Sequence, residues 1–305
     1  MILINRLPSL TARKACRARD LVGDAFRHYF EAKYHDYGST LVQNRYNTSM
    51  QNKVSVGDIA RFEVGNTIAV LVNTAPAVFW MLFYLYSSPH VLQECRDEVQ
   101  SVVSDTSEAN KTRRIVNISN IKQNCPILTS AFQEVLRQRT LGTQVRQVMQ
   151  DTMLDGKYLL KKDATVIMPS LVMHTDPAVW GPHVSEFKHK RFTKGEKAQS
   201  SHKPNPKALR VFGGGTTLCP GRHFATTEIL ATVVMFILRY DLFPVNDRWT
   251  PPKTEKSNLA AVVMEPDTDI TVRVVPRDGT ADCEWEFKLS DSTMVFGVAA
   301  EDRHD

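Results

Sequence analysis

The chain has 305 residues, of which 42% are hydrophobic and 23% are charged, and this composition excludes a disordered or fibrous protein. Its net charge of +5 permits an acidic partner but does not require one, because scattered surface lysines and arginines give the same excess. The five cysteines form no C-x-x-C pair, which argues against a disulfide framework and a structural zinc site and favours a reducing compartment.

Helical periodicity and capping residues predict the first elements of the chain. Residues 9–34 carry apolar side chains at i, i+3 and i+4 spacing, which indicates a helix. Ser55 and Asp58 form a capping box that opens a long apolar helix. Ser88 followed by Pro89 is the pattern of an N-cap and a first helical residue. We expect that helix to end near residue 103.

The long apolar helix raises the question of a membrane span. Residues 64–86 carry no charge, and their length is sufficient to cross a bilayer. Polar groups and a proline interrupt the middle of this stretch at Asn66, Asn73, Thr74 and Pro76. Because uninterrupted apolar spans are the norm in lipid, a helix through the core of a large α-rich domain is favoured. A single-span membrane protein is the alternative.

The second half of the chain mixes helical and strand signals. We expect a polar loop over 104–117 and a helix from Pro126. Asp155-Gly156 indicates a hairpin turn between apolar stretches. Further strands are predicted at 164–170, 260–264 and 270–275, a loop-rich region over 176–210, and an apolar helix that ends near residue 240. The interleaving of these elements predicts one mainly α domain of the α+β class with small antiparallel sheets.

The segment RVFGGGTTLCPGRHFATTEIL places a lone cysteine between glycines and the start of a helix. The glycines allow close approach of the backbone to a bound flat group, and the helix N-terminus stabilises the thiolate form of Cys219. A rigidly held thiolate surrounded by backbone N–H groups is what an axial haem ligand needs. A phosphate loop requires a lysine that is missing here. A nucleophilic cysteine that uses His223 as its base, or an inert buried cysteine, is also compatible with the segment.

The pattern F-x-x-G-x-x-x-C-x-G is met by Phe212, Gly215, Cys219 and Gly221. With this pattern the segment resembles the haem-binding loop of the cytochrome P-450 superfamily. The resemblance implies that the cofactor is haem, iron protoporphyrin IX, with Cys219 as the axial ligand of the iron and Phe212, Gly215 and Gly221 in the binding loop.

Other stretches resemble the same family in the expected order. EVLR contains Glu134 and Arg137, which resemble the family's E-x-x-R pair, and FKHKRF resembles a later segment that supplies Arg191. The resemblance implies a buried network of these three residues beside the haem. Arg146 matches a position that binds a haem propionate, although an ordinary strand arginine is an equal alternative.

Two departures from the family pattern bear on the chemistry. Thr217 stands where most members have a basic residue that pairs a propionate, so that contact is lost or comes from Arg146 or Arg222. In the long helix, Ala75 and Pro76 occupy the positions of the usual acid and alcohol. Pro76 is expected to kink the helix and open a groove.

The residues before that proline are the candidate catalytic residues. Asn73 and Thr74 are expected to organise water or dioxygen. The pattern NT-x-PA-x-FW is similar to the branch with prostacyclin synthase and the sterol hydroxylases of bile-acid synthesis, which holds both hydroxylases and an isomerase that uses no dioxygen. The region around the cysteine is most similar to fungal members.

The resemblance implies a haem-thiolate monooxygenase of secondary metabolism that hydroxylates or epoxidises an apolar small molecule, namely a terpenoid, sterol, fatty acid or polyketide. Its implied partner is NADPH-cytochrome P-450 reductase, and no nucleic-acid partner is expected. Basic residues near the loop could dock the reductase, although an ordinary solvated surface is the more common explanation of such a set: Lys203, Lys207, Arg210 and Arg222. An isomerase or dehydratase that uses no dioxygen, and an inactive truncated fragment, are the alternatives.

The resemblance covers only the C-terminal portion of the family fold. We expect residues 1–277 to form that catalytic portion and residues 278–305 to form a loosely held acidic tail. The implied location is intracellular. The family is usually anchored to the endoplasmic reticulum, whereas no anchor is found in this chain, and peripheral association with a membrane is compatible with the sequence.

Overall fold

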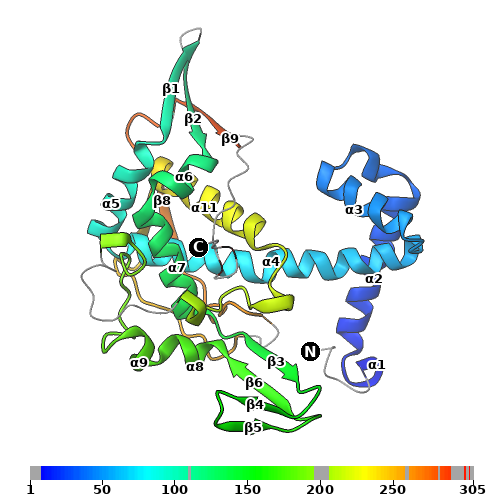
Figure 1. The fold of residues 1–305 in the computed structure, drawn as a ribbon. Coiled ribbons are helices and arrows are strands. Elements are labelled where there is room, and N and C mark those ends of the chain that lie inside the picture. The colour runs from blue at the N-terminus through cyan, green and yellow to red at the C-terminus, as the bar shows by residue number, and fades with distance from the viewer. Residues whose placement is uncertain are drawn as a thin grey trace. The chain divides into compact units, whose positions relative to one another are not determined.

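The computed structural model describes residues 8–108, 111–195, 206–257, 261–280, 282–289, 299 and 302. The chain divides into two compact units, Met1–Val72 and Asn73–Asp305, and helix α4 contributes to both (Figure 1). The α-helices are α1 (Pro8–Thr11), α2 (Arg13–Glu31), α3 (Thr40–Gln51), α4 (Val56–Tyr86), α5 (Pro89–Gln100), α6 (Ile118–Asn124), α7 (Pro126–Arg139), α8 (Ser170–Thr175), α9 (Pro177–Trp180) and α11 (Arg222–Arg239). Short 3-10 helices are η1 (Tyr34–Tyr37), η2 (Pro206–Ala208) and η3 (Gly215–Thr217).

The first unit is helical, as its periodicity predicts. A small core cluster consists of Phe30 from α2 and of Ile59 and Ala60 from α4. The ring of Tyr46 on α3 stacks on Phe30 with ring centres 5.1 Å apart. One half of the predicted capping box is confirmed, because the Ser55 hydroxyl accepts the Asp58 N–H at 3.2 Å. The Asp58 carboxylate accepts from the Ser55 hydroxyl at 2.8 Å.

Helix α4 runs without interruption through Pro76 and changes character along its length. It is the one helix, among the described residues, that is long and apolar enough to span a membrane. Its C-terminal part is a core helix, as predicted, because Trp80, Met81 and Leu85 are fully buried. Phe62, Ile68 and Leu71, which precede the boundary between the units, are exposed in the structure.

Four helices supply most of the core of the second unit. The apolar faces of α4, α5, α7 and α11 contribute buried side chains to one continuous cluster. Helix α11 supplies the most regular stripe, with Ile229, Leu230, Val233, Val234, Ile237 and Leu238 all buried. The spacing i, i+3, i+4 and i+7 within this set is that of one helix face. This apolar face packs α11 into the core, directly after the Cys219 loop in the chain.

The sheets are small and mostly antiparallel, which confirms the predicted fold class. Their strands are β1 (Val103–Glu108), β2 (Lys111–Asn117), β3 (Thr143–Gln147), β4 (Thr152–Leu154), β5 (Tyr158–Leu160), β6 (Thr165–Pro169), β7 (Tyr240–Pro244), β8 (Val272–Pro276) and β9 (Glu284–Lys288). Strand pairs β1–β2, β3–β6, β4–β5 and β7–β8 are antiparallel, whereas β9 lies parallel to β2. The predicted turn at Asp155-Gly156 joins β4 to β5, and both residues have positive φ.

The structure corrects three sequence-based expectations. The stretch 104–117 is not a loop, because β1 and β2 pair along it (Figure 1). The acidic segment from 278 onward is not loosely held throughout, because β9 pairs with β2 and Trp285 lies under the Arg114 guanidinium at 5.4 Å. Within the described part of 260–264, the only pairing is an isolated bridge between Thr140 and Val263.

Candidate functional site

The loop that carries Cys219 is a tight structure in front of α11. Gly213 and Gly215 have φ values of +82° and +62°, a region that L side chains rarely adopt. The Cys219 N–H donates to the Phe212 carbonyl oxygen at 2.9 Å and closes the loop. The Cys219 side chain is half-buried, and α11 begins at Arg222, directly after Gly221. A thiol with partial access is thus presented at a helix N-terminus.

Arg146 reaches this loop from the neighbouring strand β3. Its guanidinium donates to the Gly214 carbonyl oxygen at 3.2 Å and to the Thr217 hydroxyl. The structure therefore places a cation beside the position where Thr217 replaces the basic residue expected from the family. Both of these hydrogen bonds are to the Cys219 loop, whereas a third, at 2.9 Å, is to the carbonyl oxygen of Val145 on the same strand.

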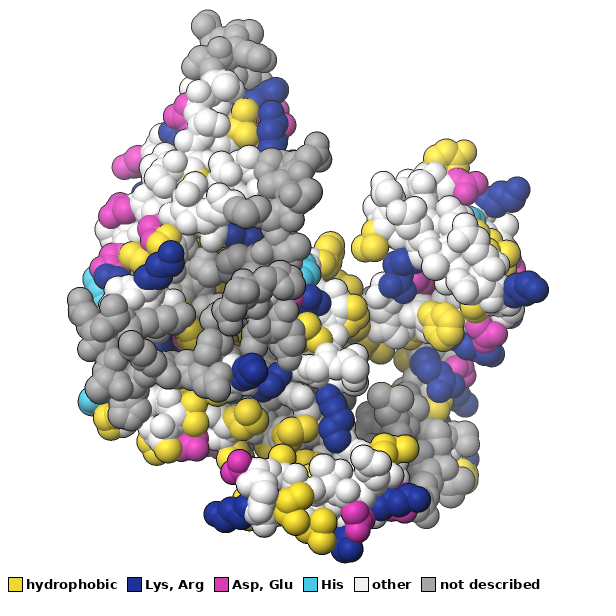
Figure 2. Space-filling model, viewed as in Figure 1, with side chains coloured by type: hydrophobic (Ala, Val, Ile, Leu, Met, Phe, Trp, Pro, Cys, Tyr) yellow, Lys and Arg dark blue, Asp and Glu magenta, His cyan; other side chains and the backbone are white. Residues whose placement is uncertain are grey.

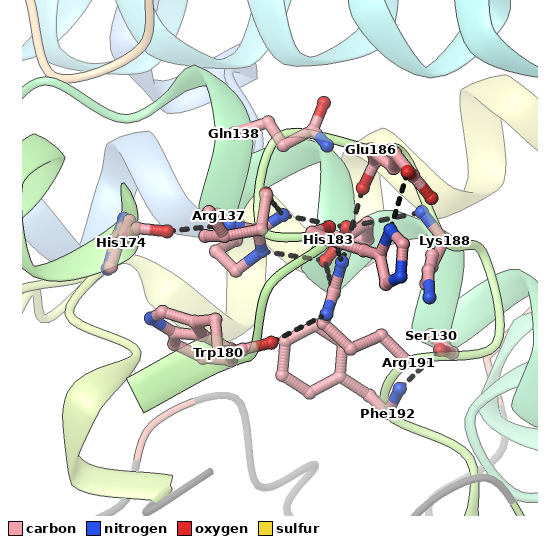
Figure 3. Close-up of polar contacts among 12 residues, drawn as sticks. Ser130, Arg137, Gln138, His174, Trp180, His183, Glu186, Lys188, Arg191 and Phe192 are labelled. Atoms are coloured by element: carbon pink, nitrogen blue, oxygen red, sulfur yellow. Dashed lines mark hydrogen bonds and ion pairs between the residues drawn. The ribbon is translucent and has the colours of Figure 1, made fainter. Parts of the chain in front are cut away.

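The E-x-x-R residues of α7 form a buried bidentate pair. The Arg137 guanidinium donates to both carboxylate oxygens of Glu134, at 2.8 Å each, and the two side chains are 0–1% exposed. Arg137 also donates to the carbonyl oxygens of His174 at 2.6 Å and Val184 at 2.7 Å. Figure 3 shows Arg137 between His174 on one side and the segment with His183 and Lys188 on the other.

Arg191 completes the network from the FKHKRF segment. Its Nε donates to Glu134 at 2.9 Å, and its terminal nitrogens donate to the carbonyl oxygens of Trp180, His183 and Glu186 at 3.2 Å (Figure 3). The Lys188 N–H donates to Glu134 as well, at 3.2 Å. One buried carboxylate thus holds two arginines and a backbone amide, which is the pairing that a buried charge requires.

His174 joins this network to the cysteine loop, a role that no sequence pattern indicates. Its carbonyl oxygen accepts from Arg137, and its Nε2 accepts the Arg210 N–H at 2.9 Å, two residues before Phe212. Because Nε2 is the acceptor, the neutral ring carries its proton on Nδ1. Burial, together with the nearby Arg137 charge, lowers the pKa of His174 to about 4.

The candidate catalytic residues lie within α4, where Asn73 is half-buried and Thr74 is buried. The Asn73 side-chain oxygen accepts the N–H groups of Val262 and Val263 at 2.8 and 3.2 Å. Thr74 is 8% exposed. The acceptor atom of Asn73 is therefore committed to the backbone at 262–263, and only its amide N–H groups remain for water or a ligand. That tether spans a long sequence separation and carries no local sequence signal.

The basic residues expected near the loop differ in their surroundings. Lys203 lies outside the described residues. Arg222 is already paired, because its guanidinium contacts the Asp302 carboxylate at 2.5–3.0 Å. No local pattern indicates this pairing, since the two residues lie 80 positions apart.

The residues present fit a haem group. The half-buried thiol stands on a loop that contains two positive-φ glycines, and Gly215 has no atom within 4 Å of the position of a Cβ, so the backbone leaves open space there. A single cysteine just before a helix N-terminus fits the donor of a haem thiolate site. Arg146 is a cation beside the loop, which is the kind of group that pairs a carboxylate.

Comparisons with known proteins agree with this geometry. The family model described as cytochrome P-450 matches residues 1–272. Cytochrome P-450 monooxygenase nodJ of Hypoxylon pulicicidum is 35% identical and covers 97% of this chain. Cholesterol 7-alpha-monooxygenase of Cricetulus griseus is 27% identical over 88% of it. A crystal structure of a cytochrome P-450, CYP102L1, superposes with a TM-score of 0.57 at 22% identity and covers 73% of this chain and 46% of that one, which shows the shared fold.

The match is to part of the relatives' length. The chain spans 59% of nodJ and 55% of the cholesterol 7-alpha-monooxygenase, so it covers between half and three fifths of each. The family model nevertheless matches most of the chain, and the residues it matches include the Cys219 loop and the Glu134 network. The chain belongs to the cytochrome P-450 family.

Proposed function

We propose that this chain contributes the haem-binding portion of a haem-thiolate monooxygenase that oxidises an apolar small molecule. The observation that carries the proposal is the Cys219 loop, in which positive-φ glycines and the start of α11 hold a half-buried thiol. Cys219 would hold the iron through its sulfur, and Phe212, Gly215 and Gly221 would form the cradle. When bound, the haem supplies the chemistry that activates dioxygen with electrons from a reductase.

The chain's own residues have distinct roles in this proposal. The Glu134, Arg137 and Arg191 network fixes the segments beside the loop, and His174 transmits that order to Arg210. Arg146 would pair a porphyrin carboxylate. On α4, the amide N–H groups of Asn73 and the hydroxyl of Thr74 would orient water or dioxygen, while the Asn73 oxygen keeps the segment at 262–263 in place.

The proposed substrate class is supported by the relatives and by the apolar character of α4. One relative's name specifies a sterol, cholesterol, and another is a fungal monooxygenase. We therefore infer an apolar small molecule of the terpenoid, sterol, fatty acid or polyketide classes. Electrons would come from NADPH-cytochrome P-450 reductase, whose acidic face would meet basic residues near the loop such as Lys207 and Arg210.

The test is a difference spectrum of the purified, haem-supplemented chain. With a thiolate ligand, the reduced and carbon-monoxide-bound form shows a strongly red-shifted Soret band, which the Cys219→Ser variant is expected to lose. Cys283→Ser is the matched control, because Cys283 is also half-buried but lies outside the loop. An unchanged spectrum in Cys219→Ser would show that Cys219 is not the iron ligand. A folded chain that takes up no haem would favour the inactive fragment.

An isomerase or dehydratase that uses no dioxygen is the second candidate. The observation in its favour is α4 itself, where Ala75 and Pro76 replace the acid and alcohol and the acceptor atom of Asn73 is occupied. Turnover of an organic peroxide without reductase and NADPH would support this candidate. Product formation that requires both reductase and dioxygen would support the monooxygenase.

Association with an intracellular membrane is proposed from the surface of the β4–β5 hairpin. Met153, Leu154, Tyr158 and Leu159 are each more than half exposed on it, and Figure 2 shows hydrophobic and basic side chains next to each other over this hairpin. Such a surface favours anionic lipid. Co-sedimentation with anionic vesicles should decrease in Leu159→Ser but not in Phe243→Ser, which removes an exposed apolar side chain elsewhere.

A further inference from the structure

We infer that Asp302 is a positioning residue for the cysteine loop, acting through Arg222, so that the Asp302–Arg222 ion pair is a clamp on the loop that presents Cys219. The inference rests on the proposed function of that loop. It concerns a residue outside the stretch 1–272 that the family model matches.

The contact is a bidentate ion pair. The Arg222 Nε lies 3.0 Å from both carboxylate oxygens of Asp302, and a terminal nitrogen lies 2.5 Å from one of them. The other terminal nitrogen of Arg222 donates to the Cys219 carbonyl oxygen at 3.2 Å. One guanidinium thus joins the C-terminal carboxylate directly to the backbone of the cysteine. The planar fork of arginine is suited to such a double contact, whereas lysine is not.

The burial of the pair shows that it is more than a surface contact. The Asp302 side chain is 4% exposed and that of Arg222 is 19% exposed. The Ala299 N–H donates to the Asp302 carboxylate at 3.1 Å and so helps to orient it. His223 contributes a second nitrogen 3.6 Å from Asp302. A carboxylate so little exposed is tolerated only when it is paired, so this placement depends on Arg222.

The position of Arg222 explains what the clamp does. Arg222 is the first residue of α11, and its own N–H makes only a long contact of 3.4 Å to the Cys219 carbonyl oxygen. The guanidinium therefore adds a second, charge-assisted hold on that carbonyl. The orientation of this peptide group sets the direction of the Cys219 side chain, and partners of this kind orient ligands in metal sites.

The first test uses the full chain without haem. In a Cys16→Ser, Cys283→Ser background, Cys219 is the one half-buried thiol, because Cys95 and Cys125 are buried. Asp302→Asn should raise the alkylation rate of Cys219 and the hydrogen-exchange rate of the 212–222 amides. A chain that ends at Leu289 should do the same while keeping β9. Asp278→Asn, an exposed carboxylate of the same segment, is the control. Unchanged rates in both variants would overturn the inference.

The second test measures haem affinity by absorbance titration. Loss of the clamp should weaken haem binding by roughly tenfold, the lower end of the effect of removing a residue that orients a ligand. Tighter haem binding in Asp302→Asn would overturn the inference, because it would show that the ion pair of Asp302 with Arg222 hinders haem binding. If wild type takes up no haem, the proposed function fails, whereas the alkylation and exchange results still decide whether the clamp exists.

A charge exchange separates positioning from simple loss of stability. Arg222→Asp alone and Asp302→Arg alone should each free the loop, whereas the two together should return the alkylation rate and the thiolate spectrum toward wild type. Arg222→Lys should rescue only in part because it cannot make the bidentate contact. Failure of the exchanged pair to recover either signal, in a chain with native thermal stability, would contradict the positioning role.

Discussion

Glu134 and Arg137 face each other on one side of α7 and make two parallel hydrogen bonds of 2.8 Å with almost no exposure to solvent. On an exposed helix such an i, i+3 pair contributes only about 0.2–0.5 kcal/mol. Here both partners also hold backbone groups of distant segments, including the His174 carbonyl oxygen and the Lys188 N–H. The pair thus connects α7 to the segments that contain His174 and Lys188.

Arg137→Met should cost about 3–5 kcal/mol of unfolding free energy, because it leaves the Glu134 carboxylate buried with fewer partners. Urea unfolding, followed by the fluorescence of the tryptophans in the second unit, measures this loss of free energy. Glu255→Gln is the control, since Glu255 pairs with Lys253 on the surface with both side chains about three quarters exposed, and it should cost less than about 1 kcal/mol. Similar losses in the two variants would contradict the role of burial.

The depressed pKa of His174 predicts a specific loss of stability in acid. The pKa lies near 4 in the folded chain and near 6.5 in the unfolded chain, so the unfolded state binds more protons between these values. Stability from this group is complete above about pH 6.5 and lost as the pH falls toward 4, a change on the order of 3 kcal/mol. Comparing urea midpoints of wild type and His174→Gln from pH 7.5 to 4 checks it. His183→Gln, at an exposed position, should keep the wild-type profile.

Asn73 should matter for stability even before any substrate binds. Asn73→Leu leaves the N–H groups of Val262 and Val263 without their acceptor, and one buried unsatisfied group costs about 1–3 kcal/mol. Hydrogen exchange of the peptide that covers 261–266 should therefore accelerate. Asn66→Leu is the matched control, because the Asn66 side chain donates to Glu63 within the first unit at 3.3 Å and makes no hydrogen bond to the 262–263 backbone among the described residues. Slow exchange at 262 and 263 in Asn73→Leu would show that the tether is dispensable.

Glycines with positive and negative φ in the Cys219 loop should differ in how well they tolerate substitution by alanine. Gly213→Ala forces a Cβ at a φ of +82° and within 3.3 Å of the Thr217 carbonyl oxygen, so it should cost about 1–2 kcal/mol and weaken haem uptake. Gly221→Ala should be milder, because Gly221 has a φ of −85° and no atom within 4 Å of an added Cβ. Thermal melting with and without haem compares them. A larger loss at Gly221 than at Gly213 would refute this assignment of the strain.

Local signals in the sequence account for much of the fold. The Ser55–Asp58 box, the Asp155-Gly156 turn and the start of α7 at Pro126 depend on neighbouring residues, and each is found where the sequence predicts it. Strands β1 and β2 escape such prediction because their sequence is polar and their third strand, β9, is supplied from far along the chain.

The candidate site divides in the same way. The spacing of Gly215, Cys219 and Gly221 is visible in the sequence, and so is the E-x-x-R pattern on α7. The contacts of His174, Asn73 and Asp302 are not visible, because each depends on a partner brought near by the fold and no residue type or spacing marks it.

The parallel pairing of β9 with β2 has a consequence for how this chain is made. Arg113 and Glu284 contact each other across 171 positions, so at ribosomal speeds of about 5–20 residues per second β2 waits roughly 10 to 30 seconds for its partner. Until then the hairpin presents an open edge of backbone donors and acceptors. The nascent chain therefore passes through an aggregation-prone stage. Slower elongation or a shortage of chaperones should increase the fraction of the protein that forms inclusion bodies.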